Sequence, residues 1–227
     1  MKYVLATALG FLLGCALVLV GLHYNPFTTN SEAISSANAR VFTYRSPFIE
    51  GLAVTHSGQS RLPLVPKEIP DLWESTISDS ILTVIVLRDD EDVPVGIASR
   101  ISQFSDRTEL LVRGVLVDDD LLVTIPGEGS LFIDADSNLW PFLKETLIPV
   151  WYLYRPWQGP KIYHPTAGPA ASGVAIVAGA TGSFAAREGT AFESYQVSSF
   201  SATTGPGSMD ARLFLNLPRN STSLVAE

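Results

Sequence analysis

The sequence predicts an all-β domain, either a closed barrel or a sandwich, behind an N-terminal apolar segment. From residue 81 onward, short runs rich in β-branched and aromatic residues recur at near-regular spacing. Turns containing Gly, Pro or Asp separate these runs, and no convincing amphipathic helix longer than about ten residues follows residue 22. Short strands joined by such turns are typical of barrels and sandwiches.

Residues 3–22 contain no charged side chain. A helix of this length spans about 30 Å, the thickness of the hydrocarbon core of a bilayer. The sequence therefore predicts a transmembrane anchor over residues 1–22. Lys2 and the α-amino group favour a cytoplasmic N-terminus, so the rest of the chain is expected to be periplasmic or extracellular.

Two alternatives to this anchor stay open. In a cleavable signal peptide the cleavage site lies near the apolar end, whereas the Ala-x-Ala motif at residues 37–39 lies far beyond it. In a lipoprotein the residues after the cysteine are usually polar, whereas those after Cys15 stay apolar. Both observations favour the uncleaved anchor.

The remaining chain divides into a tether, a domain and a tail. Residues 23–40 are polar, rich in Ser and Asn and without a period, which predicts a flexible tether. The β domain is expected over residues 41–218, followed by a tail over residues 219–227. Three prolines in residues 61–73 exclude a central strand or a helix interior there.

The strands are predicted from β-branched runs and from alternation. The first runs over residues 81–88 and ends at an acidic turn. The last has Ala211, Leu213, Leu215 and Leu217 on one face, which should be buried. Residues 139–147 are the segment that best fits a helical turn. Further strands are expected at 94–104, 108–117, 121–125, 130–133, 148–155 and 174–178.

Residues 174–192, VAIVAGATGSFAAREGTAF, raise the question of a dinucleotide-binding loop. Such a loop needs a helix directly after its glycines, because the pyrophosphate rests on the N-terminus of that helix. Residues 192–200 instead alternate with a period of two, and only 45 residues follow Gly182. We therefore reject the nucleotide loop and predict a tight turn between two strands, formed by Gly179, Gly182 and Gly189.

The stretch GATGSFAAREGTA, residues 179–191, resembles the glycine signature GGTGxFxxAxGxA of the allene oxide cyclase and dirigent barrels. Residues 210–217 fit the closing strand of that family, so the resemblance covers mainly residues 173–217. It implies an eight-stranded antiparallel barrel with an apolar cavity, often assembled as a homo-oligomer. Family members bind hydrophobic or radical-derived substrates, and some steer a cyclisation without a cofactor. The resemblance thus implies a hydrophobic small molecule or lipid as ligand, and no cofactor.

Polar residues on the long strand are the candidate catalytic groups. Glu193 and Tyr195 lie on one face of this strand, and Arg187 has the same parity. A buried carboxylate near a phenol can act as a general acid–base pair. The alternative is that this face is solvated. The candidate ligand-binding residues, with the same ambiguity of face, are Arg113, Tyr152, Tyr154 and Arg187.

Two further patterns allow more than one interpretation. The oxygen side chains of Asp134, Asp136, Asn138 and Glu145 imitate the spacing of a calcium loop, but Leu139 stands where such loops need Gly. A chance pattern or a plain turn fits better, and no metal site is predicted.

Residues 139–157 hold three of the four tryptophans. They fit either the lipid interface or a buried core, and the core is favoured.

Composition excludes several functions. The net charge is −8 and no basic stripe is present, so nucleic acid is not expected as a partner. The signatures of serine hydrolases are absent. The leading hypothesis is a membrane-anchored, exported barrel that binds a hydrophobic molecule, and the sequence leaves open whether it also converts that molecule as an isomerase or cyclase. The alternative is a non-catalytic accessory or interaction protein at the membrane surface.

Overall fold

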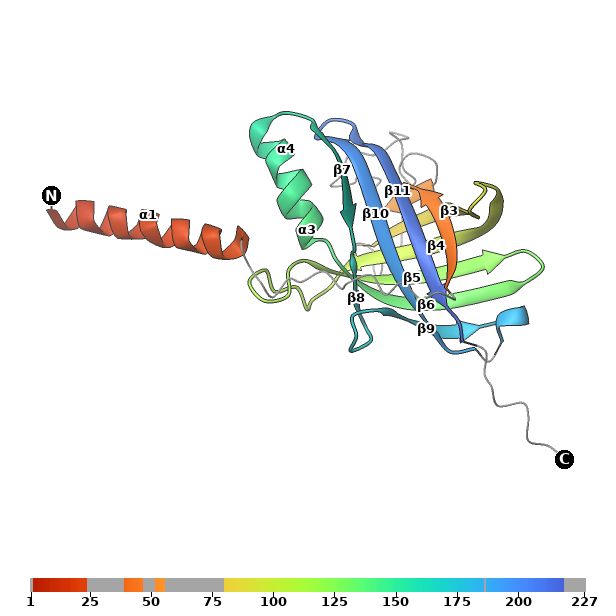
Figure 1. The fold of residues 1–227 in the computed structure, drawn as a ribbon. Coiled ribbons are helices and arrows are strands. Elements are labelled where there is room, and N and C mark those ends of the chain that lie inside the picture. The colour runs from red at the N-terminus through yellow and green to blue at the C-terminus, as the bar shows by residue number, and fades with distance from the viewer. Residues whose placement is uncertain (1, 24–38, 47–51, 56–79, 186, 219–227) are drawn as a thin grey trace.

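The chain forms an N-terminal apolar helix and a closed antiparallel barrel in the computed structural model (Figure 1). The structure describes residues 2–23, 39–46, 52–55, 80–185 and 187–218. Most of the predicted tether, the proline-rich residues 61–73 and the tail lie outside these ranges. Helix α1, Lys2–His23, is apolar between its terminal lysine and histidine. By length and composition its residues Tyr3–Gly21 can cross a membrane, and a signal sequence has the same properties.

Eight strands close the barrel. Neighbours pair antiparallel in the order β1, β11, β10, β9, β6, β5, β4, β3. The ring closes where Thr43 of β1 pairs with Arg88 of β3. The predicted all-β class is confirmed, with a barrel rather than a sandwich. The strands are β1 (Arg40–Arg45), β3 (Ile81–Arg88), β4 (Pro94–Phe104), β5 (Leu116–Ile125), β6 (Gly129–Asn138), β9 (Ala175–Ala180), β10 (Gly189–Ser201) and β11 (Gly205–Asn216).

Three short strands extend this ring. Strand β2, Leu52–Thr55, pairs with β3. Strand β7, Trp157–Tyr163, pairs with β10, and β8, Thr166–Gly168, pairs with β6. The position between β10 and β6 is therefore shared, because β9 pairs with both strands at one end while β7 and β8 pair with them farther along.

The predicted strands 81–88 and 94–104 are confirmed as β3 and β4. The predicted division into strands 108–117 and 121–125 is wrong, because residues 108–115 form turns and β5 runs without a break from residue 116 to 125. Three consecutive aspartates fit inside β5. Asp118 and Asp120 face outward, while Asp119 faces the interior and receives hydrogen bonds there.

The predicted strand 148–155 is also wrong. Residues 140–153 form a continuous helical segment, the cap helix, made of α3 (Trp140–Phe142), η2 (Leu143–Leu147) and α4 (Ile148–Leu153). The composition of residues 148–155 favours a strand, but Leu147 and Val150 are buried against Phe200 of β10. Burial at helical spacing thus overrides local propensity. The helical turn predicted at 139–147 is confirmed but too short.

Of the three glycines predicted to form a tight turn, Gly182 lies between β9 and β10, whereas Gly179 lies within β9 and Gly189 begins β10. Gly182 has a φ of +62°, and a Cβ placed there would lie 2.2 Å from the carbonyl oxygen of Glu128. The backbone N–H of Ser183 donates to that oxygen at 2.7 Å. A Cβ at Gly189 would lie 2.5 Å from the carbonyl oxygen of Asn216. Both glycines are therefore required because two backbones approach closely.

The barrel interior changes character along its axis. At one end, which we call the filled end, apolar side chains from every strand of the ring pack together. Those with at most 1% of their surface exposed include Phe42, Leu87, Ala98, Val123, Leu131 and Leu215. At the other, which we call the cavity end, strands β1, β3, β4, β5, β6 and β10 present polar side chains, which include Tyr44, Thr83, Arg100, Asp119, Ser137 and Tyr195. The predicted buried face of β11 is confirmed at Ala211, Leu213 and Leu215.

Candidate functional site

A cavity of about 210 Å³ lies at the cavity end of the barrel. The cap helix and the strands contribute apolar walls, which include Phe104, Val117, Leu139, Phe142, Leu143 and Phe200. The polar lining includes Tyr44, Arg100, Ser102, Asp119, Ser137 and Tyr195. A mainly apolar cavity with a few convergent polar groups is typical of small-molecule sites.

Strand register brings two tyrosines to one level of the barrel. Ala211 of β11 pairs with Tyr44 of β1 on one side and with Tyr195 of β10 on the other. Because alanine is small, both phenol rings can extend into the interior above it. Tyr195 also pairs with Tyr163 of β7, which likewise lines the cavity.

Tyr44 and Tyr195 are hydrogen-bonded to a buried ion pair between Arg100 of β4 and Glu193 of β10. Only 11% of the Arg100 side chain and 7% of the Glu193 side chain are exposed. The hydroxyls of Tyr44 and Tyr195 donate to the Glu193 carboxylate, Tyr195 at 2.6 Å. Arg100 donates to Tyr195 at 2.9 Å and to Tyr44 at 3.3 Å. The four side chains form one network, and the Glu193 carboxylate accepts at both oxygens.

Tyr44, Tyr195 and Arg100 each keep their proton within this network. Burial raises the pKa of Tyr44 well above 10, and it also raises the pKa of Tyr195. Burial alone would lower the pKa of Arg100, but the charges of Glu193, Tyr195, Tyr44 and Asp119 together outweigh it and the pKa is raised. Both phenols are therefore protonated donors and the guanidinium is positively charged throughout the physiological pH range.

A second carboxyl group lies in the cavity wall. Asp119 pairs across the strands with Ser102, and the hydroxyls of Ser102 and Ser137 donate to its two oxygens. Burial raises the pKa of Asp119, although the charge of Arg100 and the two serine hydrogen bonds oppose the shift. Among the described residues Asp119 has no ion pair. The cavity end therefore holds two carboxyl groups and one guanidinium.

Two nitrogens at the cavity have no hydrogen-bond partner within the described ranges. The Nε of Arg100 and the Nδ1 of His164 are both buried and unpaired. His164 lines the cavity, its ring lies 5.3 Å from that of Phe192, and burial lowers its pKa. A neutral imidazole and a guanidinium edge are thus available to a bound molecule, because buried polar atoms ordinarily have partners.

The structure brings together two of the predicted site residues. Glu193 and Tyr195 share the inward face of β10 and are hydrogen-bonded to each other. Arg187 lies in the loop before β10 and is not part of the cavity lining. Arg113 lies in the loop before β5, where its Nε is 3.9 Å from a carboxylate oxygen of Glu109.

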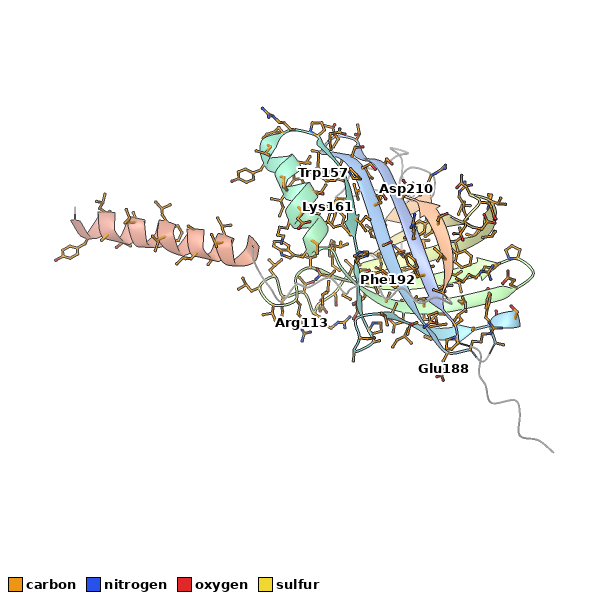
Figure 2. The ribbon with its side chains drawn as sticks, in the orientation of Figure 1. Arg113, Trp157, Lys161, Glu188, Phe192 and Asp210 are labelled. Carbon is orange, nitrogen blue, oxygen red and sulfur yellow. The ribbon has the colours of Figure 1, made fainter. Side chains whose placement is uncertain are left out.

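Tyr152 and Tyr154 lie at the end of the cap helix and face solvent. Their side chains are 85% and 91% exposed, and neither lines the cavity. Figure 2 shows side chains projecting outward from this end of the helix. The aromatic segment 139–157 is thus divided, because Trp140 and Val150 are buried as expected while the residues near the end of α4 are exposed.

Sequence reasoning missed Tyr44, Arg100, Asp119 and His164. Arg100 and Asp119 lie at the alternate positions that continue the buried faces of β4 and β5. That parity is a usable signal once the inward face of each strand is known. Tyr44 could not be found in this way, because no strand was predicted over residues 40–45.

The structure does not assemble the calcium pattern. Asp134 and Asp136 lie on β6, and Asp136 pairs with Arg107. Asn138 bonds the backbone of residues 113 and 140, and Glu145 pairs with Lys161. Across the described ranges, no group of three or more His, Cys, Asp or Glu side chains is arranged to hold a metal ion.

No family model matches this sequence, and no curated protein matches it. Among solved structures, the chain is similar to a nonspecific heme-binding cyclase that catalyses [4 + 2] cycloaddition during neoabyssomicin biosynthesis. The identity is 12%, the match covers 85% of this chain and 71% of that chain, and the TM-score is 0.41. A likeness at this level carries no argument about function, which has to come from the cavity itself.

Proposed function

We propose that this protein is a membrane-anchored barrel whose exported domain binds a hydrophobic small molecule in the cavity. The barrel rearranges that molecule as an isomerase or cyclase of the allene oxide cyclase and dirigent type. One observation carries the proposal, namely a mainly apolar cavity with Arg100, Tyr44 and Tyr195 in its wall, all three bonded to the buried Glu193 carboxylate behind them. The glycine signature of residues 179–191 supports the same barrel type.

The network supplies an electrophilic contact for an oxygen atom of the ligand. The free Nε–H of Arg100 can donate to a carbonyl, epoxide or hydroxyl oxygen, and so can a phenol if it exchanges its partner. Such donors in a low-dielectric cavity stabilise negative charge that develops on oxygen. Tyr195, which lines the cavity, can give its hydroxyl proton to one atom of the ligand and take a proton back from another, so that the phenol is restored. Glu193 lies outside the lining and holds that hydroxyl through their 2.6 Å hydrogen bond. An isomerisation or cyclisation needs no oxidant or reductant, so atoms and electrons balance within the ligand.

Charge at the cavity end favours a neutral ligand. Glu193 already compensates Arg100, and Asp119 adds a second carboxyl group without an ion pair among the described residues. A ligand carboxylate would add a further negative charge at low dielectric, which is unfavourable. We therefore propose an apolar molecule with hydroxyl or carbonyl groups as the ligand class.

The first test is native mass spectrometry of the full chain purified in mild detergent, followed by solvent extraction. We expect a co-purifying apolar compound at fixed stoichiometry. Glu193→Gln and Tyr195→Phe should lower its occupancy or its conversion, whereas Gln196→Ala, which alters an exposed residue of the same strand, should not. An empty protein, or equal loss in all three variants, would contradict the proposal.

Anchoring and topology need a separate test. The proposal expects the chain to resist alkaline carbonate extraction and its domain to be cleaved by protease added to the outside of intact cells. Release by carbonate, or a mature chain that begins after residue 23, would show that α1 is a signal sequence instead.

The second candidate is a non-catalytic accessory protein at the membrane surface. The exposed aromatic residues at the end of the cap helix favour it, because buried interfaces are enriched in Trp and Tyr. This candidate predicts an empty cavity in the mass spectrometry experiment and a captured partner whose binding depends on Trp151.

A further inference from the structure

The cap helix has one face fixed to the barrel. Leu147 and Val150 are buried against Phe200, and the Thr146 hydroxyl lies 2.7 Å from that of Tyr163. The Phe142 ring meets the rings of Tyr163 and Phe200 edge-on at 5.7 and 5.6 Å. The helix therefore cannot rotate to bury its other face without losing these contacts.

The end of the same helix presents an apolar surface. Four consecutive residues, Trp151, Tyr152, Leu153 and Tyr154, are 59–91% exposed, and we call them the aromatic row. Tyr154 has a φ of +51°, a left-handed conformation that is uncommon outside glycine. Tyr154 is the C-cap residue of α4, and helices commonly end in this conformation.

A second apolar surface lies at the start of the cap helix. Leu110, Leu111 and Val112 are about half exposed at the tip of the 105–115 loop. The loop is held to the cap, since the backbone N–H of Leu139 donates to the carbonyl of Val115 at 2.8 Å. Figure 1 shows the loop and the cap helix on the same side of the barrel.

The cavity lies between these two surfaces. Phe104, which precedes the loop, and Phe142 and Leu143 of the cap all line the cavity, and Phe104 is about half exposed. The rim of the cavity is therefore apolar and continuous with the loop and the cap. An apolar molecule crossing this rim would meet little polar surface.

Charge and chain length both point to a bilayer as the partner. Residues 105–115 and 139–157 carry four basic and three acidic side chains, so the net charge of −8 resides elsewhere in the chain. The sixteen residues 24–39 join α1 to β1 and reach at most about 55 Å. A strand of 12 residues spans about 40 Å. The tether is thus long enough for the cavity end to face the membrane while β1 starts at the filled end.

We propose that the barrel docks on a lipid bilayer through the aromatic row and the tip of the 105–115 loop, with the rim of its cavity at the membrane surface. Trp and Tyr are favoured at the interface of a bilayer, where their apolar rings and polar groups are both accommodated. The ligand then enters from the bilayer without crossing water. The docking depends on the anchor of the proposed function in one respect only, which is that the anchor raises the local concentration of the barrel at the membrane.

Tryptophan fluorescence tests the docking in the full chain. Helix α1 contains no tryptophan, so quenching by brominated lipids in reconstituted vesicles reports the barrel alone. In a Trp73→Phe background, Trp140 is buried and Trp157 is partly buried. We expect Trp151→Phe to reduce the quenched fraction about threefold, because it removes the exposed tryptophan that would meet the lipid, and Trp157→Phe to leave most of it.

A second readout does not depend on that reporter. Amide hydrogen exchange at residues 110–112 should be at least about threefold slower when the chain is bound to vesicles than when it is free of lipid and detergent, since docking excludes water. Trp151→Ser/Leu153→Ser should abolish the slowing. Val93→Ser is the matched control, because Val93 is 52% exposed in the turn after β3, at the filled end.

The outcomes separate docking from anchoring. Quenching of Trp151 in vesicles supports docking, and it does so as well if carbonate releases the chain and the released chain is added to the vesicles. In that case the anchor fails and the docking stands. Unquenched Trp151 in vesicles overturns docking. So does a concentration-dependent dimer, lost in Trp151→Ser/Leu153→Ser, that covers the aromatic row in place of lipid.

Discussion

The two ends of the barrel interior are built from the same strands and differ in chemistry. On β5, Val123 at the filled end is fully buried and apolar, while Asp119 four residues earlier faces the cavity. On β4, Ala98 is fully buried and Arg100 is the next inward residue. Strand β1 changes in the same way between Phe42 and Tyr44.

The apolar side chains of the filled end stabilise the fold more than the buried ion pair of the cavity end does. Close-packed aliphatic side chains gain both transfer free energy and dispersion contacts. A buried ion pair is at best neutral relative to a packed apolar pair, because both ions lose their hydration. The network around Arg100 and Glu193 is therefore consistent with the ligand-binding function proposed above. Changes at the two ends should have different signatures.

The largest effect is expected at the ion pair. Glu193→Leu removes the partner of Arg100 and leaves a buried charge, which should lower the free energy of unfolding by about 3–5 kcal/mol. Adding Arg100→Met to that variant should restore most of the loss, because both charges are then removed. Denaturant titration of the full chain in detergent, followed by circular dichroism, measures both. A double variant as unstable as the single one would show that the network is needed for the fold itself.

At the filled end, truncating a buried side chain lowers stability because it leaves a cavity. Leu131→Ala, at a side chain with no exposed surface, should lower the free energy of unfolding by about 3 kcal/mol. Ligand occupancy should not change, since Leu131 does not line the cavity. Leu122→Ala, at a half-exposed residue of the adjacent strand, is the control and should cost under about 1 kcal/mol. Loss of ligand in Leu131→Ala would mean that the two ends are coupled.

A smaller, pH-dependent effect is expected at Asp119. Its pKa is raised by burial above the ordinary value of 3.8, so its stabilising contribution is present below that value and is lost as pH rises through the raised pKa. The stability of the native protein relative to Asp119→Asn should therefore fall from acid to neutral pH. The groups facing Asp119 are Ser102, Ser137, Arg100 and Glu193. Thermal unfolding of the native protein and of Asp119→Asn from acid to neutral pH gives the difference in stability. A difference that rises with pH would mean that the charge of Arg100 affects the pKa of Asp119 more than burial does.

The smallest effect is expected on the surface of the filled end. Arg40 pairs with Glu128, and both side chains are 39% exposed. Solvent screens such a pair, so Arg40→Ala should change the free energy of unfolding by less than about 1 kcal/mol. The change should shrink further in high salt. A larger loss would mean that β1 depends on this contact to close the ring.

The fold could be predicted further than the site. The alternation in residues 210–217 located the buried face of β11, and the glycines of residues 179–191 located the turn before β10. Both signals are local, because alternation and a positive φ depend on near neighbours. The cap helix could not be found in this way, since its conformation depends on packing against Phe200 of a distant strand.

The sequence alone determined that the domain is built of strands, that an apolar helix precedes it, and that Glu193 and Tyr195 share a face. Only the tertiary structure decided that this face points inward and that Arg100 and Tyr44 meet it. The contacts of Glu193 with these two residues join positions 93 and 149 apart in the chain. Strand order and register set such contacts, and both are determined by closure of the whole ring, which no short stretch of sequence encodes.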